Sequence, residues 1–271
     1  CPILEDLTVC RAHDDNVPVL LVRSKSLERL CVRSGPGVSS AYAIEIDSPG
    51  VKYIDFRDGY SYRFAAKDLS SLVMTEVDTQ FNTELGFTMQ LHLIHDFLVG
   101  VSSGRHMVIS ERTLEILRIY FCLKQCLELP IPKFHYLTRL EAKFSNLLLD
   151  SLPDFLDMCP NLKHLTMYFA YSMTLEPEDL QLTKVPLCLQ STLDCVEVKE
   201  VLTREKTGKM SKKAAMKVVN HKKRIWMEVV RYFLENSEVL KTFILCLTDS
   251  DITKELLGFT ERTPRCQVIF R

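Results

Sequence analysis

The stretch that decides the fold runs from Leu137 to Met167 and reads LTRLEAKFSNLLLDSLPDFLDMCPNLKHLTM. It contains the phrase L-x-x-L-x-(apolar) twice, and the two copies begin 25 residues apart, at Leu137 and Leu162. The last two apolar positions of each phrase are two residues apart, which places both side chains on one face of a short strand. The stretch therefore predicts two strands of the same kind that are joined by an apolar connection.

The same phrase recurs along the whole chain. Its copies begin at Leu4, Leu27, Val51, Leu69, Leu114, Leu137, Leu162, Leu193 and Leu240. Several successive copies are 23–25 residues apart, which is within the roughly 20–29-residue period of leucine-rich repeats, but one step is 18 residues and another is 47. Because one unit cannot bury its apolar face alone, stacked units share a core. We expect an α/β leucine-rich-repeat solenoid, a curved parallel sheet with helices on its convex side.

Four segments between the phrases have helical patterns. HKKRIWMEVVRYFLENS is the clearest, because Ile225 and Phe233 share an apolar face opposite the charged residues. MQLHLIHDFLVGVSS carries an apolar stripe, and LLLDSLPDFLDMCP predicts a helix interrupted near Pro153. SDITKELLGFTERTP begins with a capping residue at Ser250 or Asp251. Strands that alternate with helices at this period agree with the solenoid.

Composition places the chain among ordinary soluble proteins, with 46% hydrophobic and 25% charged residues and a formal net charge of -1. A chain with this balance has no overall field that would attract nucleic acid or an anionic membrane. No apolar run approaches the ~20 residues of a membrane-spanning helix, and the opening lacks the pattern of a signal peptide. The first residue is Cys1 rather than Met, so we expect a fragment.

Ten cysteines are scattered without a C-x-x-C pair, and most of them stand beside apolar residues. This pattern predicts reduced, buried thiols in an intracellular protein, nuclear or cytoplasmic, rather than a zinc site or a disulfide framework.

The sequence predicts no catalytic, cofactor-binding or metal site. It lacks the G-x-S-x-G, H-E-x-x-H and G-x-G-x-x-G motifs, and its nine glycines leave few places where the backbone can approach a phosphate. His92 and His95 are spaced for one helical face, but they lack a carboxylate partner at metal-site spacing other than Asp96. TGKMS at Thr207–Ser211 lacks the upstream glycine of a phosphate loop.

The polar residues in and beside the strand phrases are candidates for binding a partner, because they face away from the core. The candidate partner-binding residues are Glu28, Arg29, Lys52, Asp55, Arg118, Arg139, Lys163 and His164.

Three segments of the second half resemble plant F-box/LRR/FBD proteins. VPLCLQSTLDCVEVKE resembles the opening of the FBD module, EVVRYFLENSEVLKTFIL its central helix and strand, and LLGFTERTPRCQVIF its closing strand. The resemblance implies leucine-rich repeats over residues 1–182 and an FBD module over residues 183–271 that continues the solenoid. It also implies a role in recognising a protein substrate for an SCF-type ubiquitin ligase.

The chain departs from that family in two ways. It shows no F-box at its start, so binding to a Skp-type adaptor and cullin, which the family achieves through the F-box, is assigned to no residue here. An alternative is therefore an orphan LRR/FBD interaction module without a ligase role. In addition, residues 203–224 are basic and look like an insertion. We interpret this segment as a solvated loop, with nuclear targeting and nucleic-acid contact as alternatives.

Overall fold

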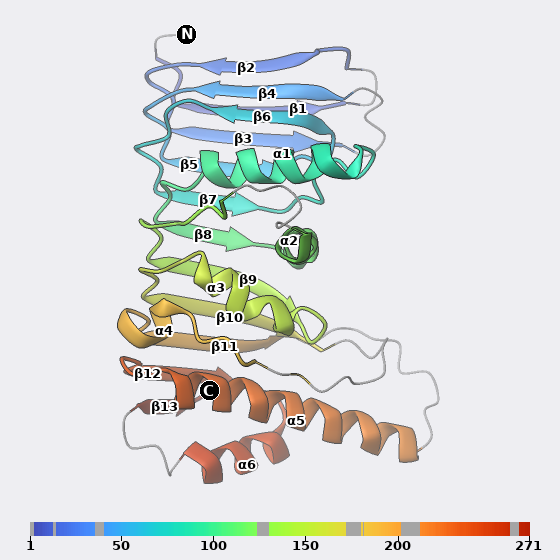
Figure 1. The fold of residues 1–271 in the computed structure, drawn as a ribbon, viewed down its shortest axis with the longest axis vertical. Helices are drawn as coiled ribbons and strands as arrows, with labels where there is room; N and C mark the ends of the chain where they lie inside the picture. The colour runs from blue at the N-terminus through green and yellow to red at the C-terminus, as the bar shows by residue number, and fades with distance from the viewer. Residues whose placement is uncertain are drawn as a thin grey trace. The chain divides into compact units, whose positions relative to one another are not determined.

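The structure is a computed structural model, and it describes residues 3–12, 15–35, 41–123, 130–171, 180, 182–201, 212–260 and 266–271. The chain divides into two compact units, Cys1–Leu140 and Glu141–Arg271. Both units are built on parallel strands with helices beside them (Figure 1). The expected α/β class is thereby confirmed.

The first unit contains a parallel sheet with the order β1-β3-β5-β7-β8. Its strands are β1 (Asp6–Arg11), β3 (Arg29–Ser34), β5 (Tyr53–Arg57), β7 (Met74–Val77) and β8 (His106–Ile109). The apolar positions of the phrase lie side by side in this sheet, so that Leu30 is beside Ile54 and Val32 is beside Phe56. All four side chains are almost completely buried. The repeat therefore forms the core in the way the spacing predicted.

The backing layer of the first unit differs from the expected helices. Three further strands form a second parallel sheet of order β2-β4-β6: β2 (Val19–Arg23), β4 (Tyr42–Asp47) and β6 (Ser61–Ala66). Helices enter this unit only later, as α1 (Phe87–Gly100), which packs on β6, and α2 (Glu111–Leu123). The prediction of helices behind the sheet is wrong for the first repeats, because their short connections return as strands.

Two copies of the phrase were placed wrongly. In the fourth copy Ile54 pairs with Thr75 and Phe56 pairs with Val77, so the unit begins at Leu72 rather than Leu69. The step from the preceding copy is then 21 residues instead of 18.

The fifth copy, LEILRI, is part of helix α2 rather than a strand. Leu114 and Leu117 are buried, as residues at i and i+3 of a helix are, whereas Ile119 is 47% exposed. The actual fifth strand is β8, whose sequence HMVI does not fit the phrase.

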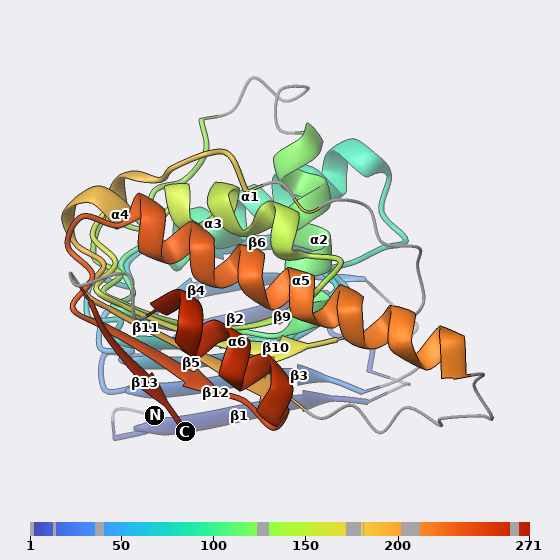
Figure 2. The same cartoon turned by 90° about the horizontal axis from the view of Figure 1, so that it is seen from below.

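The second unit contains parallel strands in the order β9-β10-β11-β12-β13. They are β9 (Arg139–Ser145), which begins at the end of the first unit, β10 (His164–Ala170), β11 (Cys195–Val201), β12 (Thr242–Cys246) and β13 (Gln267–Phe270). Helices lie on one side of these strands (Figure 2). They are the 3-10 turn η2 (Leu149–Ser151), α3 (Leu152–Asp157), α4 (Leu187–Ser191), α5 (Lys212–Asn236) and α6 (Ser250–Thr260).

The helices of this unit correct two predictions of local structure. Pro153 does not interrupt a helix but stands in the first turn of α3, where a missing N–H costs nothing. Helix α6 is capped by Asp249, whose Oδ1 accepts hydrogen bonds from the N–H groups of Asp251 and Ile252 at 2.9 and 3.3 Å, and not by Ser250 or Asp251.

The basic segment is also different from its prediction. Residues 212–224 of this segment form the first half of α5 instead of a loop, and residues 203–211 lie outside the described part of the chain, as does the sequence TGKMS. The predicted division at residue 182 stays a prediction.

Candidate functional site

Among the described residues, no helix covers one face of the strands in either unit (Figure 2). Side chains alternate along a strand, so the residues between the buried apolar positions point to this opposite face. We call it the open strand face. In the first unit it includes Arg29, Cys31 and Arg33 of β3, Tyr53, Asp55 and Arg57 of β5, and Met74 and Glu76 of β7.

Asp55 is the centre of the first unit's open strand face. Its side chain is only 3% exposed, and it accepts hydrogen bonds at 2.7 Å from both Arg33 and Arg57. Arg57 also reaches Glu76, with 3.6 Å between Nη2 and Oε2. The hydrogen bond to Asp55 is the main reason why the pKa of each arginine is raised. Asp55 is therefore a buried anchor, and the two half-exposed guanidinium groups are what this site presents to solvent.

Other predicted residues lie along the edge where the strands begin. Lys52 and Glu28 form an exposed ion pair of 2.6 Å. Arg29 pairs with Asp6 at 3.0 Å and stacks on the ring of Tyr53, 4.6 Å from its centroid. Burial, with a smaller contribution from Glu76, raises the pKa of Tyr53 to about 12. These contacts form a continuous row of polar groups across neighbouring strands.

Arg118 does not belong to this face. It lies on α2 because the LEILRI phrase is helical. The structure thus separates it from the other candidates of the first unit.

Arg139, at the end of the first unit, is exposed at the first residue of β9, and Lys163 and His164 of the second unit are exposed at the start of β10. His164 lies 4.0 Å from Asp194. All three therefore stand where a strand begins, at the edge of the open strand face.

Farther along the same strands, Tyr168 donates a hydrogen bond of 3.0 Å to Glu141. Lys199 pairs with Glu197 at 3.0 Å and lies 5.5 Å from the centroid of the Tyr168 ring. Burial, followed by the bond to Glu141, raises the pKa of Tyr168. The open strand face of the second unit is therefore also polar, with an aromatic ring among its charges.

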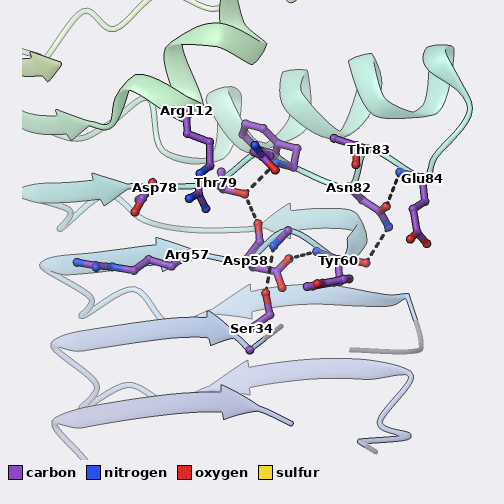
Figure 3. Close-up of a pocket in the computed structure, with 14 residues that line it drawn as sticks. Ser34, Arg57, Asp58, Tyr60, Asp78, Thr79, Asn82, Thr83, Glu84 and Arg112 are labelled. Carbon is purple, nitrogen blue, oxygen red and sulfur yellow. Dashed lines mark hydrogen bonds between the residues drawn. The ribbon is translucent and has the colours of Figure 1, made fainter. Parts of the chain in front are cut away.

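A pocket of about 430 Å³ opens in the first unit at the ends of β3, β5 and β7, next to the start of α2 (Figure 3). We call it the strand-end pocket. Its lining is almost entirely polar and consists of Ser34, Gly35, Arg57, Asp58, Gly59, Tyr60, Asp78, Thr79, Gln80, Phe81, Asn82, Thr83, Glu84 and Arg112. Arg57 belongs to both the open strand face and this pocket.

Asp58 forms the base of the strand-end pocket. Its Oδ1 accepts a 2.6 Å hydrogen bond from the hydroxyl of Tyr42, and its Oδ2 accepts bonds from the N–H groups of Tyr60 and Ser61. Arg11 stacks on the other side of the Tyr42 ring, 3.6 Å from its centroid. Burial, with a smaller effect from Asp58, raises the pKa of Tyr42 well above its usual value. Both carboxylate oxygens of Asp58 are thus used to hold the base of the pocket.

The two histidines considered as metal ligands have other partners. His92 Nδ1 lies 2.7 Å from the carbonyl oxygen of Thr88, and His95 Nδ1 lies 3.1 Å from the hydroxyl of Tyr120. Burial lowers the pKa of His95. Within the described ranges no three His, Cys, Asp or Glu side chains are grouped as metal ligands would be.

The described cysteines are all free thiols, and their burial is less complete than predicted. Cys31, Cys159 and Cys188 are buried, while Cys10 and Cys122 are exposed. Cys1 and Cys126 lie outside the described residues. Among the helices of the described ranges, none is long and apolar enough to cross a membrane.

The sequence could have revealed part of what was missed. Arg57 stands two residues after the candidate Asp55, and Arg33 stands four residues after the candidate Arg29, so the two-residue period of a strand was a usable signal. The strand-end pocket gave no such signal, because Asp78 and Arg112 are 34 residues apart and belong to no motif.

The parallel strands, the repeated apolar phrase and the polar open face define the class: an α/β protein with a repeated strand unit. Two F-box/FBD/LRR-repeat proteins of Arabidopsis thaliana are 42% and 40% identical to the chain over 99% of its length. An FBD-associated F-box protein of the same plant is 34% identical, again over 99%. No protein-family profile and no solved structure matches the chain.

The chain belongs to the plant F-box/FBD/LRR-repeat family. It spans 59% and 60% of the length of the first two of these relatives. The resemblance found in the FBD-like segments is confirmed.

Proposed function

We propose that this chain is the recognition part of an F-box protein in an SCF-type ubiquitin ligase. In this proposal it is a leucine-rich-repeat solenoid without catalytic activity of its own, and it binds a protein substrate through the open strand face. The observation that carries the proposal is the similarity along the whole chain to proteins named for an F-box, an FBD module and leucine-rich repeats. An F-box elsewhere in the full-length product would supply the contact with the adaptor and cullin.

The chemistry of the open strand face supports a protein partner. Arg33 and Arg57 each use part of their donor set on Asp55 and remain 48% and 45% exposed. Arginine and tyrosine side chains contribute strongly to protein interfaces, because they combine a planar apolar surface with hydrogen-bonding groups. Tyr53 and Tyr168 stand among the charges on the faces of the two units. This mixture is suited to a polar interface that is specific and reversible.

The proposal is tested by purifying the full-length gene product from plant-cell extract and identifying bound proteins by mass spectrometry. We expect the Skp-type adaptor, the cullin and one or more substrate proteins. Lys163→Glu changes an exposed residue of the open strand face, and we expect it to reduce recovery of substrates while the adaptor and cullin are retained. Lys67→Glu, on the outer face of the second sheet of the first unit, is the matched control.

The alternative is an interaction module of the same family without a ligase role. A folded full-length product that recovers neither adaptor nor cullin, but still retains partners that Lys163→Glu removes, would favour this alternative. Loss of partners in the control variant as well would contradict the assignment of the binding surface.

A further inference from the structure

Three charged side chains of the strand-end pocket have no hydrogen bond or ion pair among the described residues: Asp78, Glu84 and Arg112. In Figure 3, Glu84 lies at the opposite end of the lining from Asp78 and Arg112. Asp58 is fully engaged, and Arg57 is held by Asp55 and Glu76. Asp78 follows β7 and Arg112 stands in the first turn of α2. Neither side chain has a hydrogen bond or ion pair among the described residues, although both line the pocket and Asp78 contributes to raising the pKa of Arg57. In Figure 3 the Arg112 side chain descends from α2 toward the end of β7. One strong acceptor and one strong donor thus face the same pocket.

The loop that forms one wall of the pocket, residues 78–86, is fixed before any ligand arrives. The N–H of Thr79 donates to Thr113 Oγ1 at 2.8 Å, and Asn82 donates to the carbonyl oxygen of Tyr60 at 2.9 Å. Between them Phe81 has a φ of 52°, a strained conformation for a residue with a side chain. Its ring is buried, 5.4 Å from the ring of Phe97. A wall held in this way loses little entropy when it binds a ligand.

The charges of the pocket restrict the chemistry of that ligand. A carboxylate would bind Arg112 but would be repelled by Asp78. An ammonium group would bind Asp78 but would be repelled by Arg112. An uncharged amide satisfies both, because its N–H can donate to Asp78 while its C=O accepts from Arg112. Gln80 and Thr83 add two unengaged and uncharged hydrogen-bonding side chains to the lining. The volume of about 430 Å³ is within the usual range of ligand pockets.

We propose that the strand-end pocket binds an amide group of a partner polypeptide, with Asp78 and Arg112 as the two specificity-determining residues. The amide comes from an Asn or Gln side chain or from the main chain of an extended segment. This inference rests on the proposed function, since it assumes a protein partner. Arg57, which lies on both surfaces, connects the pocket with the open strand face, so one partner can occupy both.

The test is a titration of the ¹⁵N-labelled 271-residue chain, observed by NMR, with four capped peptides of sequence Ala-Ala-X-Ala-Ala in which X is Gln, Ala, Glu or Lys. We expect saturable shifts of the pocket resonances with the Gln peptide, and little change in affinity with added salt because the ligand is uncharged. Asp78→Asn and Arg112→Gln should each weaken this binding severalfold, because each variant leaves a neutral hydrogen-bonding group where the charged one stood. Arg63→Gln, on the outer face of the second sheet, should bind as the unchanged chain does.

The peptides also distinguish the two sources of the amide. If the Ala peptide binds as well as the Gln peptide, the main chain is recognised, and if it binds more weakly, the side chain is. Preferential binding of the Glu or Lys peptide would overturn the proposal, as would the absence of saturable shifts or equal binding by the Asp78 and Arg112 variants. The co-purification experiment with Lys163→Glu is independent of this result, so the pocket proposal can fail while the proposed function stands.

Discussion

The two units use one strand phrase but return the chain in different ways. In the first unit, the repeats that begin at Leu4, Leu27 and Val51 return through the short strands β2, β4 and β6. In the second unit, the connections contain helices, of which α5 is 25 residues long. A strand advances about 3.3 Å per residue and a helix 1.5 Å, so a helix needs about twice as many residues for the same distance. Steps of 21–24 residues between successive copies of the phrase therefore favour a strand as the returning segment. Longer steps leave room for a long helix.

The cores differ as well. Of the twelve buried polar or charged residues in the described ranges, nine belong to the first unit, including Arg11, Asp55 and Asp58. The three of the second unit are Ser145, Ser151 and Thr166, and its largest buried side chain is Trp226. A buried carboxylate is tolerated only when its hydrogen bonds are satisfied. Among the described residues, the core of the first unit therefore depends more on buried polar groups than that of the second unit.

The largest effect is expected from Trp226→Ala in the second unit. This indole is 1% exposed and packs edge-on against Phe169, with ring centroids 5.1 Å apart. Its loss should lower the free energy of unfolding by about 3–5 kcal/mol, because the cavity cannot close completely. Hydrogen exchange measured by mass spectrometry should show faster exchange in β10 and β11. Equally faster exchange in β3 and β5 would show that the two units unfold together and that their cores do not stabilise them separately.

The next effect is expected from Asp58→Ala in the first unit. The substitution leaves the Tyr42 hydroxyl and the N–H of Ser61 without their acceptor inside the protein. Buried donors without partners cost about 1–3 kcal/mol each, so we expect a loss of about 2–4 kcal/mol. Hydrogen exchange of residues 53–66, measured by mass spectrometry, reports on this loss of stability. Asp68→Ala, at an exposed turn, is the control and should change little. A loss no larger than that of the control would mean that the polar network contributes little to the first unit.

The sequence predicted the strands of the open face better than the layer behind them. The phrase marks two inward positions two residues apart, and this signal is correct for Leu30 and Val32 because strand periodicity is simple. It does not distinguish a strand from a helix at Leu114 and Leu117, since residues at i and i+3 also share a helical face. The backing strands β2, β4 and β6 were missed because they contain no copy of the phrase.

The candidate site could be predicted only in part, for a related reason. The place of Arg29 on the open strand face follows from strand alternation, which is local. The burial of Asp55 between two arginines depends on the register of neighbouring strands. The placement of Asp78 and Arg112 at one pocket depends on the return path through α1. Neither is encoded in a short motif.

A smaller, pH-dependent effect is expected at Glu200 in the second unit. Burial by itself raises the pKa of this carboxyl, but hydrogen bonds from Lys222 and Thr248 outweigh burial, so the pKa is lowered below 4.5. A carboxyl with a lowered pKa stabilises the fold above its unfolded pKa, and this contribution disappears as the pH falls through the folded pKa.

Glu200→Gln should therefore lower the free energy of unfolding by about 1–2 kcal/mol at pH 7 and by less near pH 4. Urea unfolding followed by fluorescence of the single tryptophan reports on the second unit, where Trp226 lies. Glu115→Gln on α2 serves as the control for the first unit. The same loss at both pH values would contradict the role assigned to the carboxylate charge.

The smallest effect is expected at the Lys52–Glu28 pair on the open strand face of the first unit. Both side chains are about half exposed, at 54% and 52%, and their charged atoms are 2.6 Å apart. Exposed ion pairs contribute about 0–1 kcal/mol because water and salt screen them, and because ordering two long side chains costs entropy. A double-mutant cycle of Lys52→Ala and Glu28→Ala, measured by urea unfolding, should give a coupling energy near the lower end of this range and smaller still at high salt. If the coupling instead approaches the cost of Asp58→Ala, the charged row is part of what holds the first unit together. A small coupling means that the stability of this unit lies in its core and strand-end network, which leaves the charges of the open face available to a partner.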